Sequence, residues 1–322
     1  MGVTGDKSEV RESACGFHYI QTYQTCPRQW FIKYVLGILP ARTASYLVLG
    51  KALHEVAAHY LETGSQPFPE VERWMIPCFE GLAEDLDPNT APQELYTTLA
   101  RMVRTAIPVW DADLQRYRVV AFEDELQPPL ANGFRMTMRP DAVVEDRETG
   151  DVWIIERKNT QSSDTGMLRS VANGDQVVAY TLGLKRTCAE RYGLDPSRVL
   201  GGIPEVSYVK GSVERTIIGD PIIPTQWQLD EYEARSIGLL SEIGNKLDLL
   251  NQGVSAEVLF GRAPTQCSGF LKCDYESICK RHLDRDSEFE GFRVDGAVGY
   301  DGPITDPKRY LEWVKAQGET ND

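Results

Sequence analysis

The chain has 322 residues, of which 42% are hydrophobic and 25% are charged, proportions typical of a folded globular protein. Its formal net charge of −14 argues against a protein that coats nucleic acid non-specifically, because such binding needs many Lys and Arg side chains against phosphates. No apolar run has the length of a transmembrane helix, and the N-terminus lacks a signal-peptide hydrophobic region, so we expect a cytoplasmic protein without membrane association.

The N-terminal region is expected to contain a tail followed by two short helices. Residues 1–15 are polar and predict a disordered tail. Residues 17–36 carry aromatic and aliphatic side chains at helical spacing, and Pro27 interrupts this pattern. Cys26 lies at the interruption, where nothing local distinguishes it from a small buried thiol.

A longer helix is predicted over residues 46–61, which are rich in Ala and Leu and precede Gly64. His54 shares a helical face with Ala57 and Leu61, and a lone histidine on such a face is more often a core residue than a metal ligand. Residues 65–115 read as a helical insertion with several prolines.

A strand is predicted next, over residues 117–125, where apolar and polar side chains alternate. Glu123 near its end would add an acidic group to a neighbouring hairpin if the two paired. A surface glutamate at a strand end is the preferred interpretation.

A β-hairpin is the central prediction. Two β-branched and apolar runs, 136–144 and 152–155, flank the polar segment 145–151, in which Thr149-Gly150 supplies a turn. Residues that face each other in an antiparallel hairpin have a constant sum of sequence numbers, and this turn places Asp141 opposite Glu156.

Three charged side chains therefore converge at the end of this hairpin. Glu156 and Lys158 point to one face because side chains alternate along a strand. Asp141 and Glu156 offer carboxylate oxygens suited to Mg²⁺ or Mn²⁺, and the ammonium group of Lys158 can orient water or an anionic transition state. The alternative is that all three are ordinary solvated residues at strand ends.

Alternating helices and strands after the hairpin favour an α/β fold. Gln176 and Tyr180 lie one turn apart on a predicted helix, where they either hydrogen-bond a phosphate or base or simply form its polar edge. The remaining predicted elements are two strands and a long amphipathic helix, over residues 205–210, 215–219 and 225–251.

Three of the chain's seven cysteines, Cys267, Cys273 and Cys279, fall within thirteen residues. In a reduced compartment this density indicates a metal or cluster site rather than disulfides. Cys26 as the fourth ligand would suit an iron–sulfur cluster, whereas His282 would make a zinc site. We assign no function to the extension over residues 283–322.

The motifs Arg139-Pro140-Asp141 and Glu156-Arg157-Lys158, with the other residues above in this order, resemble the RecB-like branch of the PD-(D/E)XK nuclease superfamily. Within that branch they resemble the iron–sulfur nucleases, a group with CRISPR-associated spacer-processing nucleases, helicase–nuclease repair complexes and phage nucleases. The resemblance implies a restriction-endonuclease-like α/β core, a mixed central sheet flanked by helices. A helical N-terminal part and a C-terminal cluster-binding segment would complete one nuclease domain over residues 16–282.

The resemblance also implies roles for individual residues. A divalent cation, Mg²⁺ or Mn²⁺, would be held by the side chains of His54, Asp141 and Glu156 and by the backbone carbonyl of Arg157, with Asp141, Glu156 and Lys158 as the catalytic set. Gln176 and Tyr180 would position DNA. A 4Fe–4S cluster would be bound by Cys26, Cys267, Cys273 and Cys279. Five residues separate Cys267 from Cys273 where many members have two, which leaves Zn²⁺ with His282 open.

The activity implied is that of a metal-dependent deoxyribonuclease, exonuclease-like, acting on single-stranded DNA or DNA ends. The chain has no GxxxxGK[ST] phosphate loop, since Gly50-Lys51-Ala52 lacks the first glycine and the hydroxyl group, so a helicase, recombination or CRISPR-type partner would be a separate protein. The alternative is a catalytically silent nucleic-acid-binding or assembly subunit, which the complete Asp, Glu and Lys set disfavours.

Overall fold

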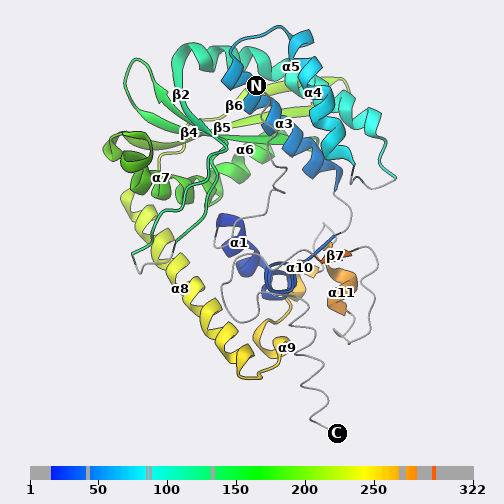
Figure 1. The fold of residues 1–322 in the computed structure, drawn as a ribbon, viewed down its shortest axis with the longest axis vertical. Coiled ribbons are helices and arrows are strands. Elements are labelled where there is room, and N and C mark those ends of the chain that lie inside the picture. Colours follow the sequence, from blue (N-terminus) through cyan, green and yellow to red (C-terminus); the bar gives the residue numbers. More distant parts are fainter. Residues whose placement is uncertain are drawn as a thin grey trace, which may run out of the picture. The chain divides into compact units, whose positions relative to one another are not determined.

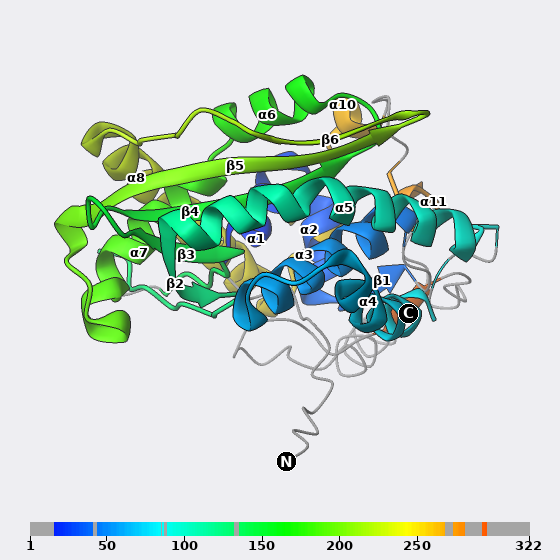
Figure 2. The same ribbon diagram turned by 90° about the horizontal axis from the view of Figure 1, so that it is seen from above.

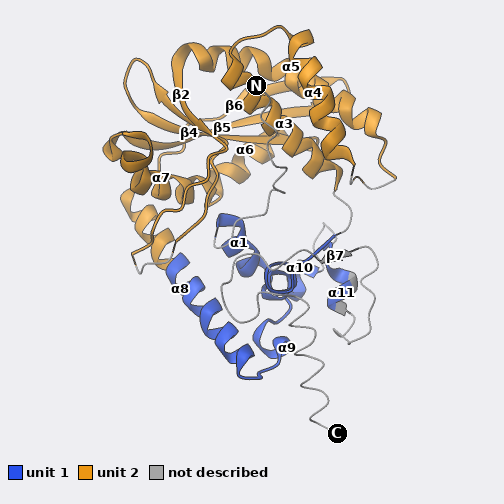
Figure 3. Cartoon of the chain, viewed as in Figure 1, with its two compact units in different colours: residues 1–41, 236–322 blue, residues 42–235 orange. Residues whose placement is uncertain are grey.

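A computed structural model describes residues 16–40, 44–84, 86, 89–131, 135–267, 273–280 and 292–294. The chain divides into two compact units, residues 42–235 and residues 1–41 with 236–322 (Figure 3). The predicted tail over residues 1–15, His282 and most of the C-terminal extension lie outside the described residues. Over the described part, no helix is both long and apolar enough to cross a membrane.

A five-stranded mixed sheet forms the centre of the unit made of residues 42–235 (Figure 1). Its order is β2-β3-β4-β5-β6, and all neighbours are antiparallel except the parallel pair β4 and β5. The strands are β2 (Tyr117–Phe122), β3 (Ala142–Asp146), β4 (Val152–Thr160), β5 (Val199–Lys210) and β6 (Val213–Ile218). The predicted α/β class, with a mixed central sheet between helices, is confirmed.

Helices cover both faces of this sheet (Figure 2). One face packs on α3 (Ser45–Thr63), α4 (Phe68–Ala83) and α5 (Pro92–Arg116) through a core that includes Leu53, Met75, Trp110 and Ile155. The other faces α6 (Asp164–Asn173) and α7 (Gln176–Tyr192); a Cβ at Gly202 would lie 2.7 Å from a methyl group of Val177. A short 3₁₀ turn, η2 (Pro196–Arg198), precedes β5, and α8 (Gln226–Asn251) begins in this unit.

Two prolines lie inside helices without ending them, Pro77 in α4 and Pro108 in α5. Both are exposed, so the carbonyl group that each leaves without an N–H partner faces solvent. The helical character predicted for residues 65–115 is therefore present, as the two long helices α4 and α5.

The predicted hairpin exists, but its first strand is shorter than expected. β3 starts at Ala142, directly after Pro140-Asp141, and pairs with β4 from Ala142 opposite Ile155 to Glu145 opposite Val152. Met138, which was expected in this strand, instead makes an isolated bridge to Leu126. Pro140 has no N–H group to donate, which accounts for a break in the ladder at this point.

The second unit contains α1 (Phe17–Thr25), α2 (Pro27–Trp30), a π-helical turn η1 (Phe31–Val35), α9 (Ala256–Leu259), α10 (Pro264–Cys267), α11 (Glu276–Lys280), the rest of α8, and the paired strands β1 (Ile38–Pro40) and β7 (Phe292–Val294). The predicted break at Pro27 is present, since this proline is the first residue of α2. Aromatic rings hold the segments together: Trp30 meets Tyr19 and Tyr23 edge-on, and Phe31 stacks on Phe260.

Candidate active site

The edge of β4 beside β3 forms the floor of the candidate site. The β3–β4 ladder ends at Ala142 opposite Ile155, so beyond Ile155 the backbone of β4 has no partner strand on that side within the described part of the chain. Asp141 lies one register step further, the position that the hairpin geometry predicts. Its Oδ2 atom accepts a hydrogen bond of 2.6 Å from the backbone N–H of Arg157. The Asp141 carboxylate thus accepts the hydrogen bond that a neighbouring strand would otherwise accept from the Arg157 N–H group.

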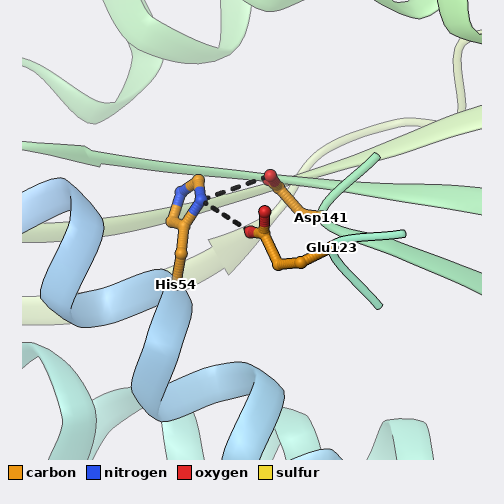
Figure 4. Close-up of side chains that lie close together, drawn as sticks. All are labelled: His54, Glu123 and Asp141. Atoms are coloured by element: carbon orange, nitrogen blue, oxygen red, sulfur yellow. Dashed lines mark ion pairs between the residues drawn. The ribbon is translucent and has the colours of Figure 1, made fainter. Parts of the chain in front are cut away.

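His54 reaches the same place from α3 (Figure 4). Its Nδ1 atom lies 3.2 Å from Oδ1 of Asp141, and its Nε2 atom lies 3.1 Å from the carbonyl oxygen of Arg157. α3 approaches β4 closely here because Gly50, one turn before His54, has no side chain: a Cβ would lie 3.1 Å from Oδ1 of Asn159. The histidine is therefore not a residue of the apolar core.

Glu123 is the residue that sequence reasoning left out of the predicted site. It follows β2 with φ of 48°, the one non-glycine residue with a positive φ in the described chain, and its Oε1 atom lies 3.4 Å from Nδ1 of His54. Ligand atoms of His54, Glu123 and Asp141 all lie within 4.8 Å of one another. Pairing of the strand before Glu123 with the hairpin was the feature that could have predicted this position, because the pairing of β2 with β3 places the end of β2 beside Asp141.

Glu156 and Lys158 occupy the same face of β4, as alternation requires. The ammonium group of Lys158 contacts Oε1 of Glu156. Glu156 is fully buried, and its Oε2 atom has no hydrogen-bond partner among the described residues. An uncompensated buried carboxylate oxygen is unfavourable unless a cation or donor binds it.

Burial and neighbouring charges shift the ionisation of these groups in different directions. Burial raises the pKa of Glu156 to about 7, with the charge of Asp141 acting in the same sense against the lowering effects of Lys158 and His54. Burial also acts to raise the pKa of Asp141, but His54 and Lys158 outweigh it and bring this pKa to about 2. The site therefore holds one firmly ionised carboxylate and one that titrates near neutrality.

Gln176 and Tyr180 lie on α7, on the side of the sheet that Glu156 faces. The amide Nε2 of Gln176 donates to the Tyr180 hydroxyl oxygen at 3.3 Å. Burial, followed by the negative charges of Glu156 and Asp141, raises the pKa of Tyr180 well above its usual range. The phenol stays protonated and remains a hydrogen-bond donor.

The donor set suits a hard divalent cation. Carboxylate and carbonyl oxygens are the ligands that Mg²⁺ and Mn²⁺ prefer, and imidazole is compatible with Mn²⁺. Nδ1 of His54 lies 3.2 Å from Asp141, and Nε2 of the same ring lies 3.1 Å from the Arg157 carbonyl oxygen. Glu156 offers a buried oxygen, Oε2, that has no hydrogen-bond partner among the described residues. These residues fit such an ion.

The four predicted cluster ligands also meet, in the unit made of residues 1–41 and 236–322. Cys26, Cys267, Cys273 and Cys279 all line one small cavity, together with Ile32 and Tyr275 among others. Burial, and then the nearby thiols, raise the pKa of Cys273; burial likewise raises that of Cys279. The raised pKa keeps these thiols neutral without a metal, and a bound metal would deprotonate them. Four cysteines around one cavity supply the ligand set of a metal or an iron–sulfur cluster, so the residues fit such a group.

Comparison with known proteins gives one clear match. The family model of the PD-(D/E)XK nuclease superfamily matches residues 18–280. No curated protein matches the chain. Among solved structures, an alkaline exonuclease from Laribacter hongkongensis is similar at 13% identity over 70% of this chain and 96% of its own, with a TM-score of 0.29. SSO0001 is similar at 11% identity over 63% of this chain and 74% of its own, with a TM-score of 0.24. Both structural likenesses are remote.

Proposed function

Since the chain belongs to the PD-(D/E)XK nuclease superfamily, we propose that it is a divalent-metal-dependent deoxyribonuclease that hydrolyses phosphodiester bonds. The observation that carries this proposal is that His54 from α3 lies 3.2 Å from Asp141, which directly precedes β3, and 3.1 Å from the Arg157 carbonyl oxygen of β4. Three separate elements supply this group, with Glu156 and Lys158 beside it on β4.

The proposed metal ligands are His54, Asp141, Glu156 and the carbonyl oxygen of Arg157. Mg²⁺ or Mn²⁺ bound there would supply an acidified water and a counter-charge for the scissile phosphate. Asp141 is suited to this role because its low pKa keeps it ionised. The N–H group of Arg157 holds the Asp141 carboxylate in place through its other oxygen.

Lys158 has the second role in the proposed chemistry. Its ammonium group is partly exposed, at 28% of the side chain, and it is held at the site by Glu156. From there it orients the attacking water or neutralises charge that develops on the phosphate. Gln176 and Tyr180 would donate hydrogen bonds that position the DNA, a role supported by their place on the Glu156 side of the sheet.

The finer parts of the proposal follow from the RecB-like, iron–sulfur branch that the motifs resemble. We propose exonuclease-like action on single-stranded DNA or DNA ends, with a separate helicase, recombination or CRISPR-type partner. A structural 4Fe–4S cluster on Cys26, Cys267, Cys273 and Cys279 is supported by their common cavity. Thiolate ligands suit a reducing compartment, so we propose that the protein works in the cytoplasm.

A cleavage assay with Mn²⁺ tests the nuclease assignment. We expect wild-type protein to degrade single-stranded and linear DNA, and Asp141→Asn and Lys158→Met to lose activity by about 100-fold or more, because each removes charge that the transition state needs. Lys210→Met, which changes an exposed lysine at the end of β5, is the matched control and should stay active. Equal degradation by all variants would exclude this site as the source of activity.

The same assay separates the enzyme from a catalytically silent binding subunit. A wild-type protein that binds DNA in a gel-shift experiment but never cuts it, with either Mg²⁺ or Mn²⁺, supports the silent subunit.

The proposed cluster is tested on anaerobically purified protein by measuring its iron, sulfide and zinc content. Iron and sulfide with a brown colour that dithionite bleaches are expected, whereas stoichiometric zinc in a colourless sample contradicts the cluster.

A further inference from the structure

Arg157 belongs to the candidate site only through its backbone. Its N–H group donates to Asp141, and its carbonyl oxygen lies 3.1 Å from His54. Because side chains alternate along a strand, its guanidinium group points to the opposite face of the sheet from Glu156 and Lys158. That side chain is buried, at 3% exposure. The contacts of the Arg157 side chain on that face therefore also affect the position of its backbone N–H and carbonyl groups in the site.

Glu205 is the ion-pair partner of the Arg157 guanidinium group. The two residues are direct neighbours in the parallel ladder of β4 and β5, and Nε of Arg157 lies 3.2 Å from Oε2 of Glu205, an ion-pair contact without hydrogen-bond geometry. The other carboxylate oxygen, Oε1, accepts a hydrogen bond of 2.8 Å from the indole N–H of Trp110. Trp110 is fully buried on α5, so the ion pair is fixed to the helix layer below the sheet.

Stability alone does not explain this ion pair. Removing two charges from water is unfavourable, and replacing a buried pair by apolar side chains of similar volume is often neutral or stabilising. Two residues earlier on the same face of each strand, the neighbouring pair is Ile155 beside Ile203, which is apolar. An apolar pair in place of Arg157 and Glu205 would continue that packing, so packing does not require the charges.

The position of the pair along β4 suggests a different role. β3 stops pairing at Ile155, so among the described residues Arg157 has a partner strand only on the β5 side, and its other side meets only the side chains of Asp141 and His54. A strand paired with another strand on one side only has more freedom to shift or twist than one paired on both. The Arg157 side chain, tied to Glu205 and through it to Trp110, restricts that freedom where the backbone meets Asp141 and His54.

We infer that Glu205 is a positioning residue for the metal site: through the Arg157 side chain it holds the N–H and carbonyl groups that face Asp141 and His54. This inference rests on the proposed metal-binding function of that site. It extends the site to the opposite face of the sheet, to a residue that touches neither the metal nor DNA.

The test replaces the ion pair by apolar side chains of similar size, in the double variant Arg157→Met with Glu205→Leu. We expect it to fold, because two buried charges leave together, with a melting temperature lowered by the loss of the acceptor for the buried Trp110 N–H group. Its affinity for Mn²⁺ should fall by about 10- to 100-fold, the usual effect of losing a residue that orients a metal ligand. Electron paramagnetic resonance of free Mn²⁺ measures this on the full chain without DNA.

Two further variants make the result decisive. Arg101→Met with Glu214→Leu removes a more exposed ion pair between α5 and β6 and should leave Mn²⁺ affinity unchanged. Glu205→Gln keeps an acceptor for Trp110 but loses the charge, and it should weaken Mn²⁺ binding less than the double variant does.

A folded double variant with wild-type affinity overturns the role of Glu205. If the double variant does not fold, a folded Glu205→Gln protein with wild-type affinity overturns it equally. A wild-type protein that binds no Mn²⁺ overturns the proposed function itself, and the positioning role with it.

Discussion

At the scale of single residues, neighbouring carboxylates determine the protonation state of His54. Burial by itself lowers the pKa of this imidazole, but Asp141 and then Glu123 raise it, to about 10. Without a cation the ring is therefore protonated at neutral pH and forms ion pairs with the two carboxylates. A metal ion must displace that proton, because only a neutral imidazole nitrogen can be a ligand.

Metal affinity should consequently rise with pH. Below the pKa of about 10, each increase of one pH unit makes the fraction of neutral His54 about ten times larger. The association constant for Mn²⁺ should therefore rise about tenfold per pH unit. Below pH 7 the dependence should be steeper, since Glu156, with a pKa of about 7, also becomes protonated. Mn²⁺ titrations from about pH 6 to about pH 9 measure this slope.

Matched histidine variants identify the group that titrates. His54→Gln should bind Mn²⁺ more weakly and with a shallower pH dependence. His59→Gln alters a histidine of the same helix that stacks on Trp74, with ring centroids 4.3 Å apart, and should change neither quantity. A wild-type affinity that does not vary with pH would contradict a proton on His54 in the metal-free site.

At the scale of secondary-structure elements, β5 depends on a glycine for its contact with the segment after β6. Gly202 donates to and accepts from Ile222, which forms an isolated bridge beside the strand. At the preceding residue, Gly201, a Cβ would lie 2.0 Å from the carbonyl oxygen of Ile222. Backbone atoms cannot move away from such an overlap as easily as the end of a side chain can.

Gly201→Ala should therefore destabilise the fold. We expect the free energy of unfolding to fall by about 1–3 kcal/mol, the usual range for overpacking, as measured by urea denaturation. Gly238→Ala in α8 is the control of opposite sign, because open space surrounds that position and alanine is the better helix former, by about 1 kcal/mol. Equal stability of Gly201→Ala and wild type would show that the segment at Ile222 adapts.

At the scale of the whole molecule, the four clustered cysteines join two distant parts of the chain. Cys26 lies between α1 and α2, and the other three lie between Cys267 and Cys279. The metal group that we propose here would link these parts, and because the unfolded chain has no preformed site, its binding energy would also stabilise the fold. All four residues belong to the unit made of residues 1–41 and 236–322.

Loss of the proposed cluster should therefore loosen that unit more than the other. In Cys279→Ser protein we expect amide hydrogen exchange to accelerate in peptides from residues 16–40 and 236–267, while peptides of the β3–β4 hairpin stay protected. Mass spectrometry of the exchanged peptides measures both. Cys78→Ser, at a cysteine of the nuclease core in α4, should change neither iron content nor exchange in residues 16–40. Uniform loss of protection would contradict an independent role for the cluster.

The sequence by itself determined the parts of the site that neighbouring residues build. The turn at Thr149-Gly150 and the alternation of side chains placed Asp141 opposite Glu156 and put Lys158 on the same face, and the structure has this register. The α/β class and the break at Pro27 followed equally from local patterns. The PD-(D/E)XK nuclease superfamily followed from motif order, and the matching family model bears out the superfamily.

Only the tertiary structure decided which residues from distant parts of the sequence join Asp141, Glu156 and Lys158 at the site. Glu123 reads as a surface glutamate until β2 pairs with β3 and its backbone adopts a positive φ. The Arg157–Glu205 pair depends on the parallel neighbour of β4, which no local pattern reveals. Local rules fix geometry over a few residues because the chain itself connects them, whereas contacts between distant segments depend on how whole helices and strands pack.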